Sequence, residues 1–176
     1  AIILEDYDKG VLSEKNIQRI ILEAKKNNIP VTADPKKENF HHYHGVSLFK
    51  PNLKELKEGL NIDFSFENER NAFETAVQNL RKAVPHEASL ITLSEHGVYI
   101  CNESEKAYIE AHKREITDVS GAGDTVIAVA TLCLLANAPI DVIAKIANIA
   151  GGMVCEKPGV VSISFEELKD EVHELL

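Results

Sequence analysis

The stretch IILEDYDKGVLSEKNIQRIILEAKKNNIPVTAD, residues 2–34, predicts two buried strands joined by an amphipathic helix. The apolar run Ile2–Leu4 leads into a polar segment, as a buried strand followed by a loop does. Behind Ser13, a good N-cap, apolar residues recur at helical spacing from residue 17 to residue 24. A second apolar run, Ile29–Ala33, follows this helix. Two strands joined by a helix favour a parallel sheet.

The remaining chain continues this alternation. Further strands are expected at Val46–Phe49, Leu90–Leu93, Gly97–Cys101 and Ala107–Ile109, the last of them hairpin-like. Helices are expected at Leu53–Leu60, over residues 67–80 with Glu67 and Glu69 in the first turn, at Gly123–Ala136, at Pro139–Val154 and at Phe165–Leu176. The apolar run VIAVATLCLLA, residues 126–136, predicts a buried helix. The sequence thus predicts an α/β layered domain with a mainly parallel central sheet flanked by helices.

Composition narrows the class of protein. The chain has 176 residues, enough for one domain with a sizeable core, and we expect residues 1–176 to form one. Nineteen basic against 28 acidic residues give a formal charge of -9, which disfavours nucleic acid and favours a small molecule as the main partner. Cys101, Cys133 and Cys155 are widely spaced, without a CxxC pair, and indicate reduced cytoplasmic thiols.

The longest apolar run, Val126–Ala136, is too short to span a bilayer, so a membrane protein is not expected. The first residues, AIILEDYDKG, look like a strand entered midway rather than a signal peptide. We therefore expect further sequence upstream of Ala1.

Polar residues follow four of the expected strands. They are Asp6 and Lys9, Asp34 and Lys36, Asn52 and Glu55, and finally Ser94, Glu95 and Gly97. In open parallel sheets, ligands bind outside the carboxyl ends of the strands. The sequence therefore predicts a ligand site where these side chains meet.

The stretch DVSGAGDTV, residues 118–126, is the strongest candidate for chemistry. It is neither a P-loop nor a dinucleotide fingerprint, since it lacks the Gly-Lys-Ser/Thr and the third glycine that those motifs need. A flexible turn that enters a helix N-terminus is a ready anion site, although Asp124 is equally a plausible helix cap. The glycines on both sides of Ala122 favour the functional alternative, because a cap does not require them. Asp124 is then placed to accept the proton of an attacking hydroxyl in phosphoryl transfer.

Three further groups carry two interpretations each. Asn52-x-x-Glu55 is more often a helix capping box, but at a strand end the pair can also hold Mg²⁺ through its water shell. The histidines of NFHHYHG (His41, His42 and His44) indicate a solvated loop that can meet phosphate more than a metal site, because no acidic or cysteine partner is near in sequence. Lys36 and Lys37 are expected to be solvated charges more than ligands.

The motifs TDVSGAGDTVIAV and KPN with Glu55 resemble the signatures of the ribokinase, or phosphofructokinase-B (PfkB), family of carbohydrate kinases. More narrowly, EDYDKGVL, VTADPKKENFHHYHGVSLFKPNLKEL, ITLSEHGVYI and ANIAGGMVCEKPGVVSIS resemble, in order and spacing, the kinase half of ADP-heptose synthases. The resemblance covers nearly all of the chain. It implies a ribokinase-like fold and ATP-dependent phosphorylation of D-glycero-β-D-manno-heptose 7-phosphate at its anomeric hydroxyl, a step in ADP-heptose biosynthesis for lipopolysaccharide.

The resemblance also implies roles for particular residues. Asp124 would be the catalytic base, and the backbone of Gly121, Ala122 and Gly123 the anion hole. The other expected roles are magnesium and phosphate binding by Asn52 and Glu55, contact with the nucleotide phosphates by Ser94 and Gly97, a position near adenine for Asn148, and a monovalent-cation site bordered by Asp118. Asp6, Lys9, Asp34 and Lys36 match the heptose-kinase pattern without a definite role.

Some features depart from the family pattern. Val129 stands where Ala or Gly is usual, Ser94 where Gly is frequent, and Lys50 where Thr is frequent. Kinases of this family are roughly twice as long, so the chain resembles a C-terminal nucleotide-binding portion without the N-terminal half and lid. We expect weak or no turnover from this portion alone, and a homodimer is possible. The alternatives are a kinase for another sugar, of the fructose or tagatose phosphate type, and a nucleotide-binding module without catalysis.

Overall fold

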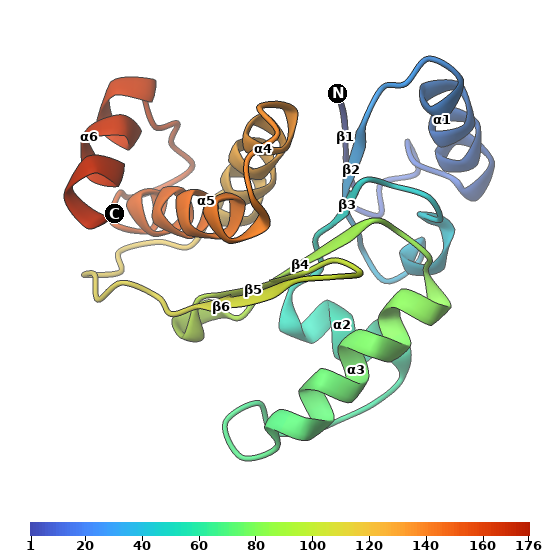
Figure 1. Ribbon diagram of the computed structural model, residues 1–176, viewed down its shortest axis with the longest axis horizontal. Coiled ribbons are helices and arrows are strands. Elements are labelled where there is room, and N and C mark those ends of the chain that lie inside the picture. The colour runs from blue at the N-terminus through green and yellow to red at the C-terminus, as the bar shows by residue number, and fades with distance from the viewer. The chain divides into compact units, whose positions relative to one another are not determined.

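The strand–helix–strand unit predicted from residues 2–34 is present in the computed structural model, which describes residues 1–176 (Figure 1). It consists of β1 (Ile2–Glu5), α1 (Glu14–Lys26) and β2 (Val31–Asp34). The Ser13 side chain accepts a hydrogen bond from the Asn16 amide and so caps α1 as predicted. All four residues of β2 are buried, as expected for a strand that is covered on both faces.

The chain divides into two compact units, Ala1–Ile91 and Thr92–Leu176. In the first unit, β2 pairs with β3 (Leu48–Phe49), and β3 pairs with β4 (Ala88–Thr92). These strands and β1 are all parallel, in the order β1-β2-β3-β4. The carboxyl ends of β1, β2 and β3 therefore face the same edge of the sheet, and polar residues follow each of them.

Two helices and a short 3-10 helix complete the first unit. They are α2 (Leu53–Leu60), α3 (Arg70–Ala83) and η1 (Phe40–His42). The predicted apolar face of α3 is buried. The prediction that Glu67 and Glu69 lie in its first turn is wrong, because Glu69 is the N-cap and Glu67 precedes it. The carboxylate of Glu69 instead accepts a hydrogen bond from the Ser65 amide, which closes the loop before the helix.

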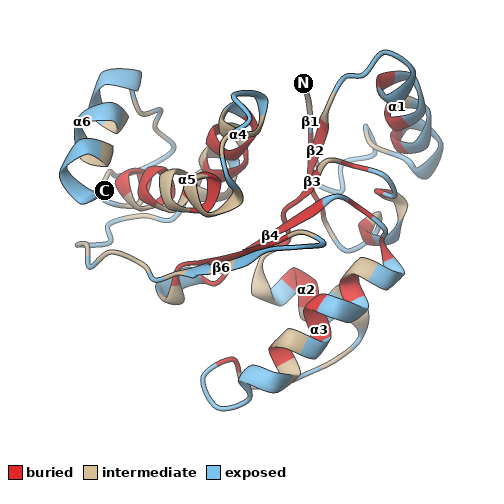
Figure 2. Ribbon diagram, viewed as in Figure 1, coloured by how far each residue is buried: buried red, intermediate tan, exposed pale blue.

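The second unit begins with the 3-10 helix η2 (Ser94–His96) and an antiparallel pair, β5 (Val98–Cys101) with β6 (Lys106–Ile109). The helices α4 (Ala122–Leu135), α5 (Ile140–Cys155) and α6 (Phe165–Leu175) follow. Helix α5 packs against α4, β5, β6 and α6, and it has the largest buried set of any helix (Figure 2). It is therefore the central element of this unit.

The prediction that the apolar helix α4 is buried holds only for its middle, residues 126–131. Val126, Ile127, Val129, Ala130 and Thr131 are buried, whereas Leu132 is 66% exposed and Leu135 44% exposed. A helix without a polar face gives no sign in the sequence of where its packing partners end. None of the helices is long and apolar enough to cross a membrane.

Candidate functional site

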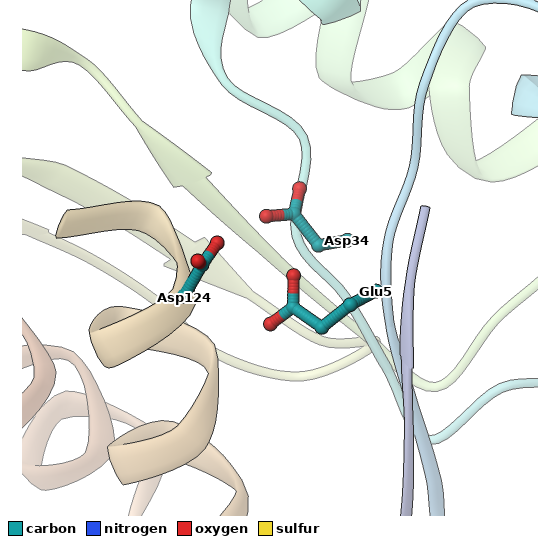
Figure 3. Close-up of side chains that lie close together, drawn as sticks. All are labelled: Glu5, Asp34 and Asp124. Atoms are coloured by element: carbon teal, nitrogen blue, oxygen red, sulfur yellow. The ribbon is translucent and has the colours of Figure 1, made fainter. Parts of the chain in front are cut away.

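The edge of the first unit where β1 and β2 end carries two carboxylates side by side. Glu5 and Asp34 are partners in the strand register, and their carboxylate oxygens lie within 4.8 Å of each other (Figure 3). Two acidic side chains this close repel each other unless a cation or an ammonium group neutralises them. The neighbouring residues show how this charge is balanced.

Lys50 directly follows β3 and is almost completely buried, with 2% exposure. Its ammonium group lies 2.9 Å from Oδ2 of Asp34, which is also buried. Burial raises the pKa of the Asp34 carboxyl, and the Lys50 charge opposes that rise. The other oxygen, Asp34 Oδ1, is buried without a hydrogen-bond partner. We name Glu5, Asp34, Lys36, Lys50 and Glu55 the charged rim.

This ion pair was not predicted from the sequence, in which Lys50 stands out only as a departure from the family pattern. A signal was present, since the lysine ends the apolar run VSLFK and a buried strand end rarely leaves an ammonium group without a partner.

Asn52 and Glu55 form a capping box at the start of α2, which confirms that interpretation of their spacing. Asn52 Oδ1 accepts from the Glu55 amide at 2.8 Å, and Glu55 Oε2 accepts from the Asn52 amide at 2.8 Å. Glu55 Oε1 pairs with the ammonium group of Lys36. Both oxygens of the buried Glu55 therefore already have partners within the protein.

The prediction that Lys36 is solvated is wrong, because its side chain is only 35% exposed and pairs with Glu55. Burial alone would lower the pKa of Lys36, but the hydrogen bond to Glu55 and the charges of Asp34, Glu55 and Glu5 raise it. Lys37 is exposed, as predicted.

Asp6 is buried and serves the loop that follows β1. It accepts hydrogen bonds from the Tyr43 hydroxyl at 2.7 Å, from Asn39 Nδ2 at 3.0 Å and from the Asp8 amide at 2.9 Å. Burial and the bond to Asp6 raise the pKa of Tyr43. Asp6 thus attaches the loop to η1, whereas Lys9 in the same loop is exposed.

The three histidines near η1 make separate contacts. His41 Nε2 lies 2.8 Å from the Gly59 carbonyl, His42 lies 3.8 Å from Glu14, and His44 is exposed. The interpretation of these histidines as a solvated loop that can meet phosphate, rather than as a metal site, stays a prediction.

In the second unit, the glycine turn opens α4. Gly121 is the N-cap and has φ +78°, in the left-handed region that glycine adopts without strain. Asp124 is the third residue of the helix and emerges from its first turn (Figure 3). The alternative that Asp124 caps the helix is therefore wrong, since the left-handed Gly121 starts the helix before it. The Ala122 amide donates to the Val119 carbonyl at 3.3 Å. The other amides of the first turn have no acceptor within the helix, and the dipole adds positive potential there.

The carboxylate of Asp118 holds the segment that leads into this turn. Its Oδ1 accepts from the Ser120 amide at 2.9 Å, and its Oδ2 accepts from the Gly159 amide at 3.0 Å. These backbone donors, the Ser120 amide first, lower the pKa of Asp118. The carboxylate therefore links the glycine turn to the loop that follows α5.

The other three residues assigned to nucleotide binding have clear structural surroundings. Ser94 opens η2 with φ +53°, and Gly97 closes it with φ +90°. A Cβ at Gly97 would lie 2.1 Å from the Ile109 carbonyl oxygen, so the close approach of β6 requires glycine. Asn148 Nδ2 donates to the Glu110 carbonyl at 2.9 Å and links α5 to the end of β6. Their roles toward a nucleotide stay predictions.

Comparison with known proteins now assigns the family. Residues 8–167 match the family described as pfkB family carbohydrate kinase. The chain belongs to the PfkB family of carbohydrate kinases. Among curated relatives, the bifunctional protein HldE of Campylobacter jejuni strain RM1221 is 41% identical over 170 residues, which cover 96% of this chain and 36% of the relative. HldE of Methylobacillus flagellatus is 38% identical over 172 residues, covering 98% and 35%. The chain thus spans about a third of the length of these relatives.

Solved structures support the fold. Phosphofructokinase-2 from Escherichia coli in complex with potassium matches with a TM-score of 0.87 at 18% identity, covering 98% of this chain and 56% of that one. Ribokinase of Arabidopsis thaliana, complexed with ribose and ATP, matches with a TM-score of 0.79 at 16% identity, covering 97% and 55%. The ribokinase-like α/β fold that the sequence predicts is confirmed.

Proposed function

We propose that this chain provides the nucleotide-binding portion of a kinase that transfers the γ-phosphoryl group of ATP to a hydroxyl of a sugar phosphate. The single observation that carries the proposal is the start of α4. There the left-handed Gly121 opens the helix, and Asp124 lies in its first turn. Amide donors for an anion and a carboxylate that accepts a proton thus belong to one helix end.

In this mechanism the backbone amides of Gly121, Ala122 and Gly123 stabilise the negative charge on the moving phosphoryl group. Asp124 accepts the proton of the attacking hydroxyl. Asp118 holds the turn in place before substrate arrives, because its carboxylate bonds to backbone amides on two segments. Such preorganised dipoles need not reorient during the reaction, which is the source of their catalytic effect.

Magnesium is expected with ATP, and the charged rim fits a hydrated ion. The observation that supports this is Asp34 Oδ1, a buried oxygen without a partner that can accept from a metal-bound water. Glu55 was predicted as the metal ligand, but its oxygens already accept from Lys36 and from the Asn52 amide. We therefore propose that Glu55 and Asn52 contribute through the water shell, where the bound ion would screen the phosphate charges.

For the acceptor we propose D-glycero-β-D-manno-heptose 7-phosphate. The support is the run of motifs shared with the kinase half of ADP-heptose synthases and the 41% identity to HldE of Campylobacter jejuni. The alternative acceptors are fructose and tagatose phosphates, since the fold is shared with a phosphofructokinase. ADP release with each sugar phosphate, with the product identified by mass spectrometry, decides between them. ATP binding without transfer to any acceptor would favour the non-catalytic module.

Substitution of Asp124 tests the proposed base. In the protein at the length its natural gene encodes, Asp124→Asn is expected to lower kcat by about 10²–10⁴ while ATP affinity changes little. The matched control is Asp141→Asn, because Asp141 lies in the first turn of α5 and pairs with Lys145. Asp124→Asn with normal turnover would remove the base from the mechanism. Residues 1–176 assayed alone test the expectation of weak or no turnover from this portion.

A further inference from the structure

Residues 110–119 lead from β6 to the glycine turn without forming a helix or strand, and Arg114 anchors them. Its Nη1 lies 2.8 Å from Glu156 Oε2, and its Nη2 pairs with Glu171. Glu156 is the C-cap of α5, and Glu171 lies on α6. One guanidinium group therefore joins this segment to two helices through separate ion pairs.

The surroundings of Arg114 are shaped to enclose it. Its side chain is only 9% exposed, and Nε is buried without a hydrogen-bond partner. A Cβ at Gly152 of α5 would lie 2.7 Å from Nε and 2.9 Å from Cδ. Glycine at position 152 is thus what leaves room for the arginine. A buried donor without a partner is unfavourable, so the two ion pairs hold this side chain in place despite the desolvation cost of Nε.

The bonds that follow Arg114 run directly to the glycine turn. The amides of Thr117 and Asp118 both donate to the Cys155 carbonyl, at 2.8 and 3.2 Å. The Asp118 carboxylate then accepts from the amides of Ser120 and Gly159. Residues 114–118 are therefore attached to residues 155–159 by an ion pair at Glu156 and by hydrogen bonds at Cys155 and Gly159.

We propose that Arg114 is a positioning residue for phosphoryl transfer. It acts through Asp118 and the backbone by holding residues 115–119 against the end of α5, so that the amides of residues 120–124 are ordered before the nucleotide binds. This inference rests on the proposed function and adds a residue that touches neither the nucleotide nor the acceptor. Glu171 makes α6 part of the same support, although α6 has no buried residue of its own.

The test compares Arg114→Met, Arg114→Lys and Glu171→Gln in the protein at its native length. Hydrogen exchange of the amides of residues 117–124 is measured together with kcat and KM for ATP. In Arg114→Met we expect exchange to rise and kcat to fall about tenfold, with KM for ATP within about twofold, because misplaced amides lose transition-state binding first. Arg114→Lys should restore part of both effects, and Glu171→Gln should give a smaller change in the same direction.

The matched control is Glu166→Gln, since Glu166 is also on α6 but forms only an exposed pair with Lys169. It should change neither exchange nor turnover. A folded Arg114→Met protein with wild-type exchange at residues 117–124 would overturn the inference. If that variant does not fold, Glu171→Gln and Gly152→Ala decide, and unchanged exchange in both would also overturn it. If the wild-type protein phosphorylates no sugar phosphate, the proposed function fails, but the exchange comparison still tests whether Arg114 orders the turn.

Discussion

The two units differ in which chemical groups carry charge at the candidate site. In the first unit, side chains carry the charge: the rim has three carboxylates, Glu5, Asp34 and Glu55, against two ammonium groups, Lys36 and Lys50. In the second unit, the positive potential at the glycine turn comes from backbone amides, which the left-handed conformation of Gly121 orients at the start of α4. In the proposed function, the rim, with one formal excess negative charge, binds a hydrated cation and the turn binds an anion. Substitutions in the rim should therefore affect stability most, whereas those in the turn should affect ligand binding more.

The largest effect on stability is expected from Lys50→Met. It leaves the buried Asp34 carboxylate without its ammonium partner, which costs about 3–5 kcal/mol when a buried ion pair is broken. Urea unfolding followed by circular dichroism measures the loss, and the double variant Asp34→Asn with Lys50→Met should recover much of it. Lys54→Met is the control, because the Lys54 side chain is 82% exposed and its removal should change stability by less than about 0.5 kcal/mol. If Lys50→Met lowers the free energy of unfolding by less than about 1 kcal/mol, Lys50 and Asp34 do not form the buried ion pair described here.

In the first unit, but outside the charged rim, His86 is expected to make the free energy of unfolding depend on pH. His86 is buried, with Nδ1 bonded to the Val84 carbonyl and Nε2 accepting from the Ser89 hydroxyl at 2.5 Å. Burial, aided by the charge of Arg81, lowers the pKa of His86 to about 4. The folded state then binds fewer protons than the unfolded state between about pH 4 and 6.5. The free energy of unfolding therefore carries the full contribution of neutral His86 above pH 6.5. It falls by roughly 3 kcal/mol as the pH drops from 6.5 toward 4.

Unfolding free energies measured from pH 4 to pH 7 check this prediction. His86→Gln should flatten the pH dependence over that range, while His44→Gln, at an exposed histidine, should leave it unchanged. Equal slopes in the His86→Gln and wild-type proteins would place the titrating group elsewhere.

The sequence predicted what local spacing determines. Helix α1 was located by its Ser13 cap and α2 by Asn52, because a cap and its helix are neighbours in the chain. The ion pairs of Lys50 and Lys36 were missed, because each partner lies on a different strand or helix and spacing does not reveal which side chains meet. The less favoured alternative, Asp124 as the helix cap, was wrong for a conformational reason, since the left-handed Gly121 starts the helix before Asp124.

The third prediction tests the backbone side of the comparison with Gly121→Ala. A Cβ at φ +78° costs roughly 1–2 kcal/mol, and it would also lie 3.3 Å from Val160 Cγ1. Gly45→Ala is the matched control, because Gly45 has φ +85° and a Cβ there would meet only Ile21 at 3.9 Å. Both variants should lose similar stability in thermal unfolding. Only Gly121→Ala should weaken ATP binding, which calorimetry measures. Equal ATP affinity in the two variants would show that the glycine turn does not bind the nucleotide.

The smallest effect on stability, and the sharpest on interpretation, comes from the two capping boxes. Asn52→Ala and Ser164→Ala each remove the side-chain acceptor of a complete box, at the start of α2 and of α6, and each should cost about 1 kcal/mol. The boxes differ in their glutamates, because Glu55 is buried and paired with Lys36 whereas Glu167 lies at the surface beside Lys157. If Asn52 serves only as a cap, the two variants should match in both stability and turnover. If it also serves magnesium and phosphate, Asn52→Ala alone should raise the magnesium concentration needed for half-maximal turnover, and this difference decides between the two interpretations that the spacing Asn52-x-x-Glu55 allows.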